Sequence, residues 1–330
     1  MECMFYEIIG SNRVKCNLCP RHCIIPDGKR GNCRVRENRA GKLYSLVYGK
    51  PCSVAIDPIE KKPLYHFMPG SRVYSLGTAG CNLHCNFCQN WTTSQAKPEE
   101  VETISLSPKE AVDEAEKNGC NLIAYTYNEP IVFYEYVIDC AKEAKKRGIR
   151  NIMVSNGFIN PEPLKELCRH IDAINIDLKG FTENFYKEYT TASLEPVLET
   201  IKTIKKKGLW LEITNLIIPE ANDDLTQIRK MCRWIKENIG EDTPLHFSAF
   251  RPCYKLNDRQ ATSKDILNKA KNIAIETGLK YVYLGNVDAD NNTYCPECGK
   301  LLIKRGWFEA VENNLEKGKC DCGFKIDGIW

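Results

Sequence analysis

Three cysteines crowded into one short stretch constrain this chain more than any other feature. Cys81, Cys85 and Cys88 follow the spacing C-x-x-x-C-x-x-C. A short loop at this spacing can turn all three thiolates toward one centre, and clusters of the 4Fe–4S type are normally held by four such thiolates. Because the stretch supplies three ligands and no obvious fourth, it predicts a cluster in which one iron is open to a non-protein ligand.

The residues before these cysteines favour a β-strand. The run 72–79 has the composition typical of a strand, so the cysteines follow a strand's C-terminal end, where α/β barrels place their chemistry. A zinc loop, or cysteines scattered through a core, is the alternative interpretation. Zinc knuckles usually combine a C-x-x-C pair with a second pair elsewhere, and the spacing therefore favours the cluster.

A strand followed by C-x-x-x-C-x-x-aromatic-C, with Phe87 at the aromatic position, resembles the signature of the radical S-adenosylmethionine superfamily. The resemblance implies a 4Fe–4S cluster on the three cysteines and S-adenosylmethionine as the ligand of the open iron. It also implies that one electron, from a donor such as ferredoxin or flavodoxin, cleaves the cofactor to methionine and a 5′-deoxyadenosyl radical. That radical would then abstract hydrogen from a substrate.

Length and composition restrict the remaining possibilities. The chain has 330 residues, of which 43% are hydrophobic, enough for one large domain with attachments. No apolar run approaches the ~18 residues of a membrane span, and the first residues are not typical of a signal peptide. A net charge of +3 is too weak to argue for a nucleic-acid partner. We therefore expect a cytoplasmic protein without membrane partners, whose 18 cysteines serve mainly as metal ligands.

The middle of the chain, residues 71–289, alternates between strand and helix patterns. This alternation implies parallel pairing and right-handed crossovers, and the number of units predicts an α/β fold with an open, partial (β/α)6 barrel similar to a TIM barrel. The radical enzymes that the chain resembles have such a core. The expected strands are 72–79, 121–126, 150–155, 173–178, 209–217, 244–249 and 281–284. The expected helices are 107–118, 130–147, 161–170, 194–207, 224–239 and 262–277.

Residues 1–70 form a separate cysteine-rich segment. Four cysteines and several turn residues occur early in it, and a turn-rich segment of this kind buries little apolar surface unless a metal holds it together. The pattern favours zinc, and a second iron–sulfur cluster is the alternative. After this group, residues 43–48 and 52–56 alternate like the two strands of a hairpin. The candidate ligands are Cys16, Cys19, Cys23 and Cys33.

Residues 290–330 depart from the strand–helix alternation and predict a zinc-ribbon-like unit. Cys295 and Cys298 form a knuckle of the C-x-x-C type, and Cys320 and Cys322 supply a second pair about twenty residues later. The second pair is C-x-C rather than C-x-x-C, which strains an ideal knuckle.

Polar residues at the strand ends that follow the cluster loop are candidates for contacting the cofactor. Glu129 stands where the superfamily usually has a glutamate that binds the methionine amine, although Tyr127 and Asn128 replace the usual glycines. Ser155 and Asn156 end the next strand and suit hydrogen bonds to the cofactor. A helix cap at Glu129 and an ordinary turn at 155–157 are the alternatives.

Two further strands carry charged or titratable candidates. Asp177 and Lys179, two residues apart, point to one side of a strand end, and Asp-Leu-Lys resembles the same place in pyruvate formate-lyase activating enzymes. Glu212 and His246 are the candidates on the strands that follow. A plain salt bridge at 177–179 and a core position for His246 are the alternatives.

Longer matches, among them 57–67, 126–130 and 281–287, resemble one narrower family, the AmmeMemoRadiSam system radical enzyme. This family is associated with partner proteins, one of them Memo-like. Three hypotheses follow: an enzyme that acts on an unidentified small molecule, an activating enzyme that makes a glycyl radical on a protein, and a metal-stabilised binding protein without turnover. The first is favoured because the family's usual partners are not glycyl radical enzymes.

Overall fold

One open eight-stranded sheet forms the centre of the computed structural model, which describes residues 1–10 and 12–330. Its strand order is β13-β12-β11-β10-β9-β8-β7-β6, and every neighbouring pair from β7 to β13 is parallel. Only β6, at one edge, runs antiparallel to its neighbour β7. The strands are β6 (Ser53–Pro58), β7 (Arg72–Gly77), β8 (Leu122–Tyr125), β9 (Arg150–Ser155), β10 (Ala173–Asp177), β11 (Trp210–Ile217), β12 (Leu245–Ala249) and β13 (Val282–Gly285).

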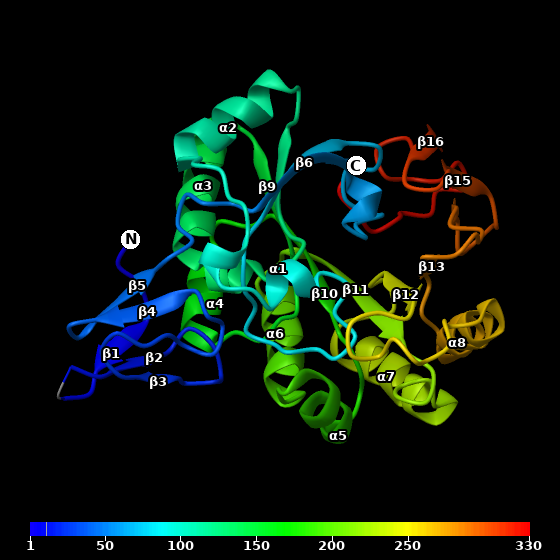
Figure 1. Cartoon of the computed structure of the whole chain (residues 1–330). Helices are drawn as coiled ribbons and strands as arrows, with labels where there is room; N and C mark the ends of the chain where they lie inside the picture. Colours follow the sequence, from blue (N-terminus) through cyan, green and yellow to red (C-terminus); the bar gives the residue numbers. More distant parts are fainter. Residues whose placement is uncertain (11) are drawn as a thin grey trace.

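Helices connect the parallel strands and lie along one side of the sheet (Figure 1). Six of them alternate with the strands, and short turns of 3-10 or π helix occur between them. The α-helices are α1 (Trp91–Ser94), α2 (Pro108–Lys117), α3 (Tyr134–Lys146), α4 (Pro161–Leu167), α5 (Glu183–Phe185), α6 (Glu195–Lys206), α7 (Leu225–Asn238) and α8 (Lys264–Thr277). The short turns are η1 (Ile59–Lys61), η2 (Pro98–Glu100), η3 (Pro130–Phe133) and η4 (Tyr186–Thr190).

This arrangement confirms the predicted α/β class and its strand–helix alternation. Six strand–helix units run from β7 to α8, and β13 adds a seventh parallel strand. The helix signals act locally as expected. Ser107 Oγ accepts a hydrogen bond from Glu110 N (3.3 Å), while the Glu110 carboxylate accepts one from Ser107 N (2.7 Å), which closes a capping box at the start of α2. Gly278 ends α8 in the left-handed conformation that glycine tolerates best.

The hairpin predicted from residues 43–48 and 52–56 is wrong. Strand β5 (Lys42–Ser45) pairs instead with β4 (Arg36–Arg39), and β6 pairs with β7 over six residues. Alternation marks both segments as half-buried strands, but it does not say which strand each one joins. Pairing with the free edge of β7 gives β6 a longer run of backbone hydrogen bonds than pairing with the four-residue β5 would. The segment 53–58 thus belongs to the large sheet, and the division of the chain at residues 70 and 289 stays a prediction.

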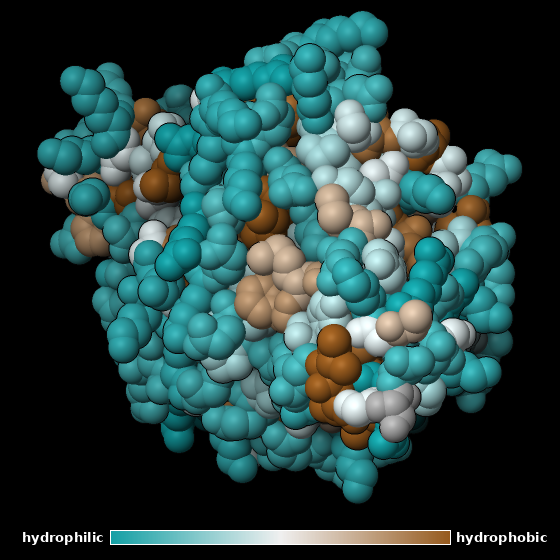
Figure 2. Space-filling view, turned by 90° about the vertical axis from the view of Figure 1, so that its left-hand side faces the viewer, coloured by the Kyte–Doolittle hydropathy of each residue, from teal (hydrophilic) through white to brown (hydrophobic). Residues whose placement is uncertain are grey.

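Small antiparallel sheets lie at both ends of the chain (Figure 1). The N-terminal one contains β1 (Tyr6–Ile8), β2 (Val14–Cys16) and β3 (Ile24–Ile25). The C-terminal one contains β14 (Thr293–Tyr294), β15 (Leu301–Arg305) and β16 (Ala310–Asn313). Figure 2 shows the face that carries the N-terminal sheets, and its surface is mostly hydrophilic with small, separate hydrophobic areas.

Residues 59–67, the segment that follows β6, pack against the concave side of the sheet. The anchor of this segment is Glu212 on β11, a fully buried carboxylate that accepts four hydrogen bonds. Oε1 accepts from His66 N (2.7 Å) and from the Trp210 indole N–H (3.0 Å). Oε2 accepts from Tyr65 N (3.0 Å) and from the ring of His246 (2.7 Å). Burial alone would raise the pKa of Glu212, but these partners, His246 foremost, hold it below its usual value.

We expect Glu212→Gln to lower the free energy of unfolding by about 3 kcal/mol, because the new amide NH₂ would face two buried donors. Urea unfolding measures this loss, and the matched exposed variant Glu237→Gln should change stability by less than about 0.5 kcal/mol. Since the folded-state pKa of Glu212 is lowered, its stabilisation is present above the ordinary glutamate pKa of about 4.3 and is lost as pH falls. The difference between wild type and variant should therefore shrink in acid; equal stability at pH 7 would contradict the assigned role.

Candidate functional site

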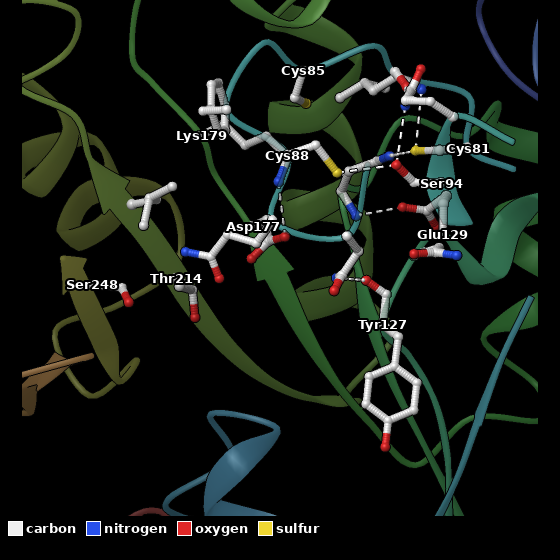
Figure 3. A pocket seen from close by; sticks show the side chains of 18 of the residues that line it. Cys81, Cys85, Cys88, Ser94, Tyr127, Glu129, Asp177, Lys179, Thr214 and Ser248 are labelled. Atoms are coloured by element: carbon white, nitrogen blue, oxygen red, sulfur yellow. Dashed lines mark hydrogen bonds and ion pairs between the residues drawn. The ribbon is translucent and has the colours of Figure 1, made fainter. Parts of the chain in front are cut away.

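A cavity of about 210 Å³ opens at the C-terminal ends of the parallel strands. Parallel pairing puts all of these strand ends at one edge, and the loop after β7 reaches across it (Figures 1 and 3). The lining side chains come from that loop and from the ends of β8 to β13. They belong to Cys81, Leu83, Cys85, Phe87, Cys88, Gln89, Asn90, Ser94, Gln95, Tyr127, Asn128, Glu129, Asn156, Asp177, Lys179, Thr214, Leu216, Ser248 and Asn286.

All three cysteines of the loop line this cavity, Cys85 buried and the other two half-buried. Cys81 Sγ accepts hydrogen bonds from Leu83 N (3.3 Å) and from the side-chain amide of Asn156 (3.7 Å). Such donors stabilise thiolates that bind metal.

The spacing of the three thiols fits a cluster better than a single ion. In the described part of the chain, three or more candidate ligand atoms lie within 4.8 Å of one another only at the C-terminal cysteines. No fourth cysteine is among the described residues that line the cavity. Cys253 lies beside the loop, with its thiol donating to Phe87 O (3.3 Å), but it does not line the cavity. Three soft ligands around an open space fit a 4Fe–4S cluster with one iron left open.

Glu129 lies beside Cys81 at the edge of the cavity (Figure 3). It ends the turn after β8, and three donors from neighbouring segments fix its carboxylate: Ser155 Oγ (2.7 Å), Ile131 N (3.1 Å) and the backbone N–H that follows Ser155 (2.8 Å). Burial raises the pKa of Glu129 to about 7, against the opposing effect of these hydrogen bonds. An ammonium group in the cavity would favour the ionised carboxylate, so this position suits an amine.

Asp177 and Lys179 form an ion pair at the end of β10, with 2.9 Å between Nζ and Oδ2. Both side chains line the cavity, and the ammonium of Lys179 lies 5.9 Å from the centre of the Phe87 ring. Burial alone would lower the pKa of Lys179, but Asp177 and the nearby Cys85 raise it above its usual value. The pair therefore keeps a fixed positive charge beside the cysteine loop and a carboxylate facing the cavity.

The residues predicted to contact the cofactor differ in whether they line the cavity. Phe87, Glu129, Asn156, Asp177 and Lys179 line the cavity. Ser155 is not among the lining residues, and its hydroxyl instead holds Glu129 from behind.

Glu212 and His246, also predicted to contact the cofactor, are not among the described residues that line the cavity. Their side chains hydrogen-bond to each other, and the Glu212 carboxylate also accepts from the backbone of Tyr65 and His66 below the cavity. Side chains two residues apart on a strand share a face but lie one layer apart. Thr214 and Ser248, each two residues further along the same strands, are the ones that reach the cavity.

Several lining residues were missed by the sequence analysis, namely Gln89, Asn90, Ser94, Gln95, Tyr127, Asn128, Thr214, Ser248 and Asn286. The period of two along β11 and β12 could have found Thr214 and Ser248, had the depth of the layer been known. Tyr127 gave no such signal. Its backbone takes the left-handed conformation at φ 72°, and its carbonyl accepts a hydrogen bond from the Asn90 side chain (2.6 Å).

Both outer cysteine groups are brought together by the fold. At the C-terminus, Cys295 and Cys322 have their sulfurs 3.6 Å apart, as do Cys298 and Cys320. A tetrahedral site with Zn–S bonds of about 2.3 Å needs sulfurs about 3.8 Å apart, so the C-x-C pair does not prevent closure. At the N-terminus, Cys16, Cys19, Cys23 and Cys33 line one small cavity of their own.

Comparison with known proteins shows which family this chain is related to. Residues 75–232 match the family model described as the radical SAM superfamily. An uncharacterized protein of Methanocaldococcus jannaschii is 51% identical over 99% of this chain and 98% of its own length. The chain belongs to the radical SAM superfamily. Members of this superfamily are enzymes, which argues against the hypothesis of a binding protein without turnover.

More distant relatives of this radical SAM protein carry functional names. The pyruvate formate-lyase-activating enzyme of Clostridium pasteurianum is 24% identical over 61% of this chain and 87% of its own length. The pyruvate formate-lyase 1-activating enzyme of Escherichia coli is 24% identical over 62% and 89%. The resemblance to activating enzymes is thereby confirmed, while the narrower AmmeMemoRadiSam family stays a prediction.

A solved structure shares the fold. Streptococcus suis SuiB bound to the precursor peptide SuiA aligns with a TM-score of 0.51 at 13% identity, covering 70% of this chain and 52% of that one. Among the described residues, no helix is both long and apolar enough to cross a bilayer.

Proposed function

We propose that this chain binds a 4Fe–4S cluster through Cys81, Cys85 and Cys88, binds S-adenosylmethionine beside it, and catalyses radical hydrogen abstraction. When bound together, the cluster and cofactor supply a 5′-deoxyadenosyl radical and methionine. The observation that carries the proposal is that the three thiols and the Glu129 carboxylate line one cavity.

Each cavity residue has a role in this proposal. The three cysteines hold the cluster, and the carboxylate of Glu129 accepts hydrogen bonds from the amine of the methionine part. Lys179, fixed by Asp177, supplies positive charge near the thiolates. Phe87 and Leu83 make the wall around the loop apolar, which excludes water from the reacting centre.

For the substrate, we propose a small molecule. Thr214 and Ser248 offer two hydroxyls along the part of the cavity away from the cysteines (Figure 3), and Asn286, which also lines the cavity, offers an amide. Groups of this kind orient a small polar molecule by hydrogen bonds. The second candidate is an activating enzyme that makes a glycyl radical on a protein partner, and the names of the relatives favour it. In either case a low-potential carrier such as ferredoxin or flavodoxin would supply the electron.

The C-terminal cysteines are proposed to hold one zinc ion, because the four thiols already lie within 4.8 Å of one another. The zinc ion would fix the turns of β14 to β16. Metal analysis of the Cys295→Ser variant should show that this zinc is lost.

Cys85→Ala should abolish formation of 5′-deoxyadenosine from S-adenosylmethionine after anaerobic reconstitution and reduction, because two thiolates cannot hold the cluster. Chromatography of the quenched reaction measures the product. Cys168→Ala is the matched control: Cys168 follows the C-terminal end of α4, and that end lies at the opposite edge of the sheet. Product from Cys85→Ala at the wild-type rate would refute the cluster assignment.

Glu129→Gln should weaken S-adenosylmethionine binding to the reconstituted protein by about 10- to 100-fold, because a charge-assisted hydrogen bond to the amine is lost. Calorimetric titration measures the affinity, with the exposed Glu102→Gln as control. An unchanged dissociation constant would remove the amine-binding role from Glu129.

The two substrate classes differ in where the abstracted hydrogen comes from. We expect deuterium to enter 5′-deoxyadenosine when the enzyme is mixed with the dialysable fraction of an extract from deuterium-labelled cells. The protein fraction of the same extract should give none. Mass spectrometry distinguishes the products, and transfer from the protein fraction alone would favour the activating enzyme.

A further inference from the structure

The four N-terminal cysteines surround a cavity of their own, separate from the one at the strand ends. Cys16 comes from β2, Cys33 precedes β4, and Cys19 and Cys23 lie in the connection between β2 and β3. Apart from the thiols, its walls are mainly apolar. Segments that are far apart in the sequence meet here, because Ile131 and Val132 of η3 also line this cavity.

The spacing of these thiols distinguishes them from the C-terminal group. The C-terminal cysteines converge within 4.8 Å of one another, as a single ion requires, and in the described residues they form the only group of three or more ligands that does so. The N-terminal four enclose a space instead of meeting at a point. A four-iron cluster is larger than one ion and keeps its four cysteine ligands farther apart, so the wider arrangement fits the cluster.

A buried cation without sufficient partners also lines this cavity. Arg36 is 1% exposed, and an ion pair joins its Nη2 to the Glu135 carboxylate at 2.7 Å. Its Nε and Nη1 atoms are buried and have no hydrogen-bond partner among the residues that the structure describes. Leaving such donors unsatisfied is costly, and an anionic occupant would satisfy them. A cluster held by four thiolates is an anion, and its sulfur atoms accept hydrogen bonds.

A backbone amide is directed at one of these sulfurs as well. Asn32 N donates to Cys23 Sγ at 3.5 Å. Hydrogen bonds of this type tune iron–sulfur clusters by stabilising the reduced, more negative state.

One residue of the loop that carries the first site reaches the N-terminal cavity. Asn82, which follows Cys81 directly, lines the N-terminal cavity. Its carbonyl accepts a hydrogen bond from Arg21 of the N-terminal segment. Its side chain accepts another, at 2.9 Å, from Asn156, whose amide also reaches Cys81 Sγ. The loop that carries Cys81 is therefore joined to the wall of the N-terminal cavity through Asn82.

We propose that Cys16, Cys19, Cys23 and Cys33 hold a second 4Fe–4S cluster that relays electrons to the site at Cys81, Cys85 and Cys88. A reduced low-potential carrier protein gives one electron to the second cluster and is itself oxidised. The second cluster then returns to its oxidised state as the first is reduced, and no bond or proton changes place. The relay rests on the function proposed above, whereas the binding of the second cluster does not.

The cluster is tested on the full chain with Cys81, Cys85 and Cys88 all changed to alanine. After anaerobic reconstitution, this variant should keep about four irons and four sulfides, and wild type should hold about eight of each. Once reduced, it should give a 4Fe–4S electron paramagnetic resonance signal that S-adenosylmethionine leaves unchanged, because four cysteines leave no iron open. In wild type, the cofactor should alter part of the signal.

Two other outcomes would show which of the two proposals fails, the second cluster or the function proposed above. A triple variant without iron, or with zinc in place of iron at these cysteines, overturns the second cluster. Wild type with about four irons that disappear in Cys16→Ser/Cys19→Ser, yet persist in the triple variant, supports the second cluster and overturns the proposed function.

The relay is tested by a ratio of rates. In Cys16→Ser/Cys19→Ser, the rate of 5′-deoxyadenosine formation with reduced flavodoxin, divided by that with dithionite, should fall at least about tenfold below the wild-type ratio. A small reductant can reach the open cavity directly, whereas a carrier protein needs the relay. An unchanged ratio would remove the relay role, and taking a ratio corrects for any general loss of folded protein.

Discussion

Parallel pairing of β7 with β8, and onward to β13, is the constraint on which the site depends. It places the ends of all seven strands at one edge, so that residues from seven segments line one cavity. Without this ladder, the loop with Cys81, Cys85 and Cys88 would be a flexible loop with three thiols. With it, Glu129 and the Asp177–Lys179 pair are held beside the thiols by backbone geometry and not by side-chain reach alone.

The bottom of the cavity, which we call the floor, is formed by a segment that precedes the cysteine loop in the sequence. Residues 59–67 cross below the site, where Glu212, itself bonded to His246, accepts hydrogen bonds from the backbone of Tyr65 and His66. The last residues of the chain close the same region, since Phe67 pairs with Ile329 and the ring of His66 contacts Asp327 O at 2.8 Å. The two ends of the open sheet are thereby joined by packing instead of by further strands.

Much of the site could be predicted from sequence, because its signals are local. The cysteine spacing, the capping box at Ser107 and the acid two residues before Lys179 each depend on a few neighbouring residues. Two kinds of information were not local. The partner of β6 depended on which strand had a free edge, and the depth of Glu212 depended on how the floor packs against β11. A strand pattern gives the face of a side chain but not its layer, so Thr214 was missed while Glu212 was chosen.

The sequence by itself determined the α/β alternation, the loop of three thiols and the existence of two further cysteine groups. Spacing along the chain is enough for these, since helices, strands and short loops form from consecutive residues. Only the tertiary structure decided that the C-terminal thiols converge within 4.8 Å of one another while the N-terminal ones enclose a space lined by Arg36. The physical reason is that the distance between ligands from separate segments is set by the packing of those segments, which no local pattern encodes.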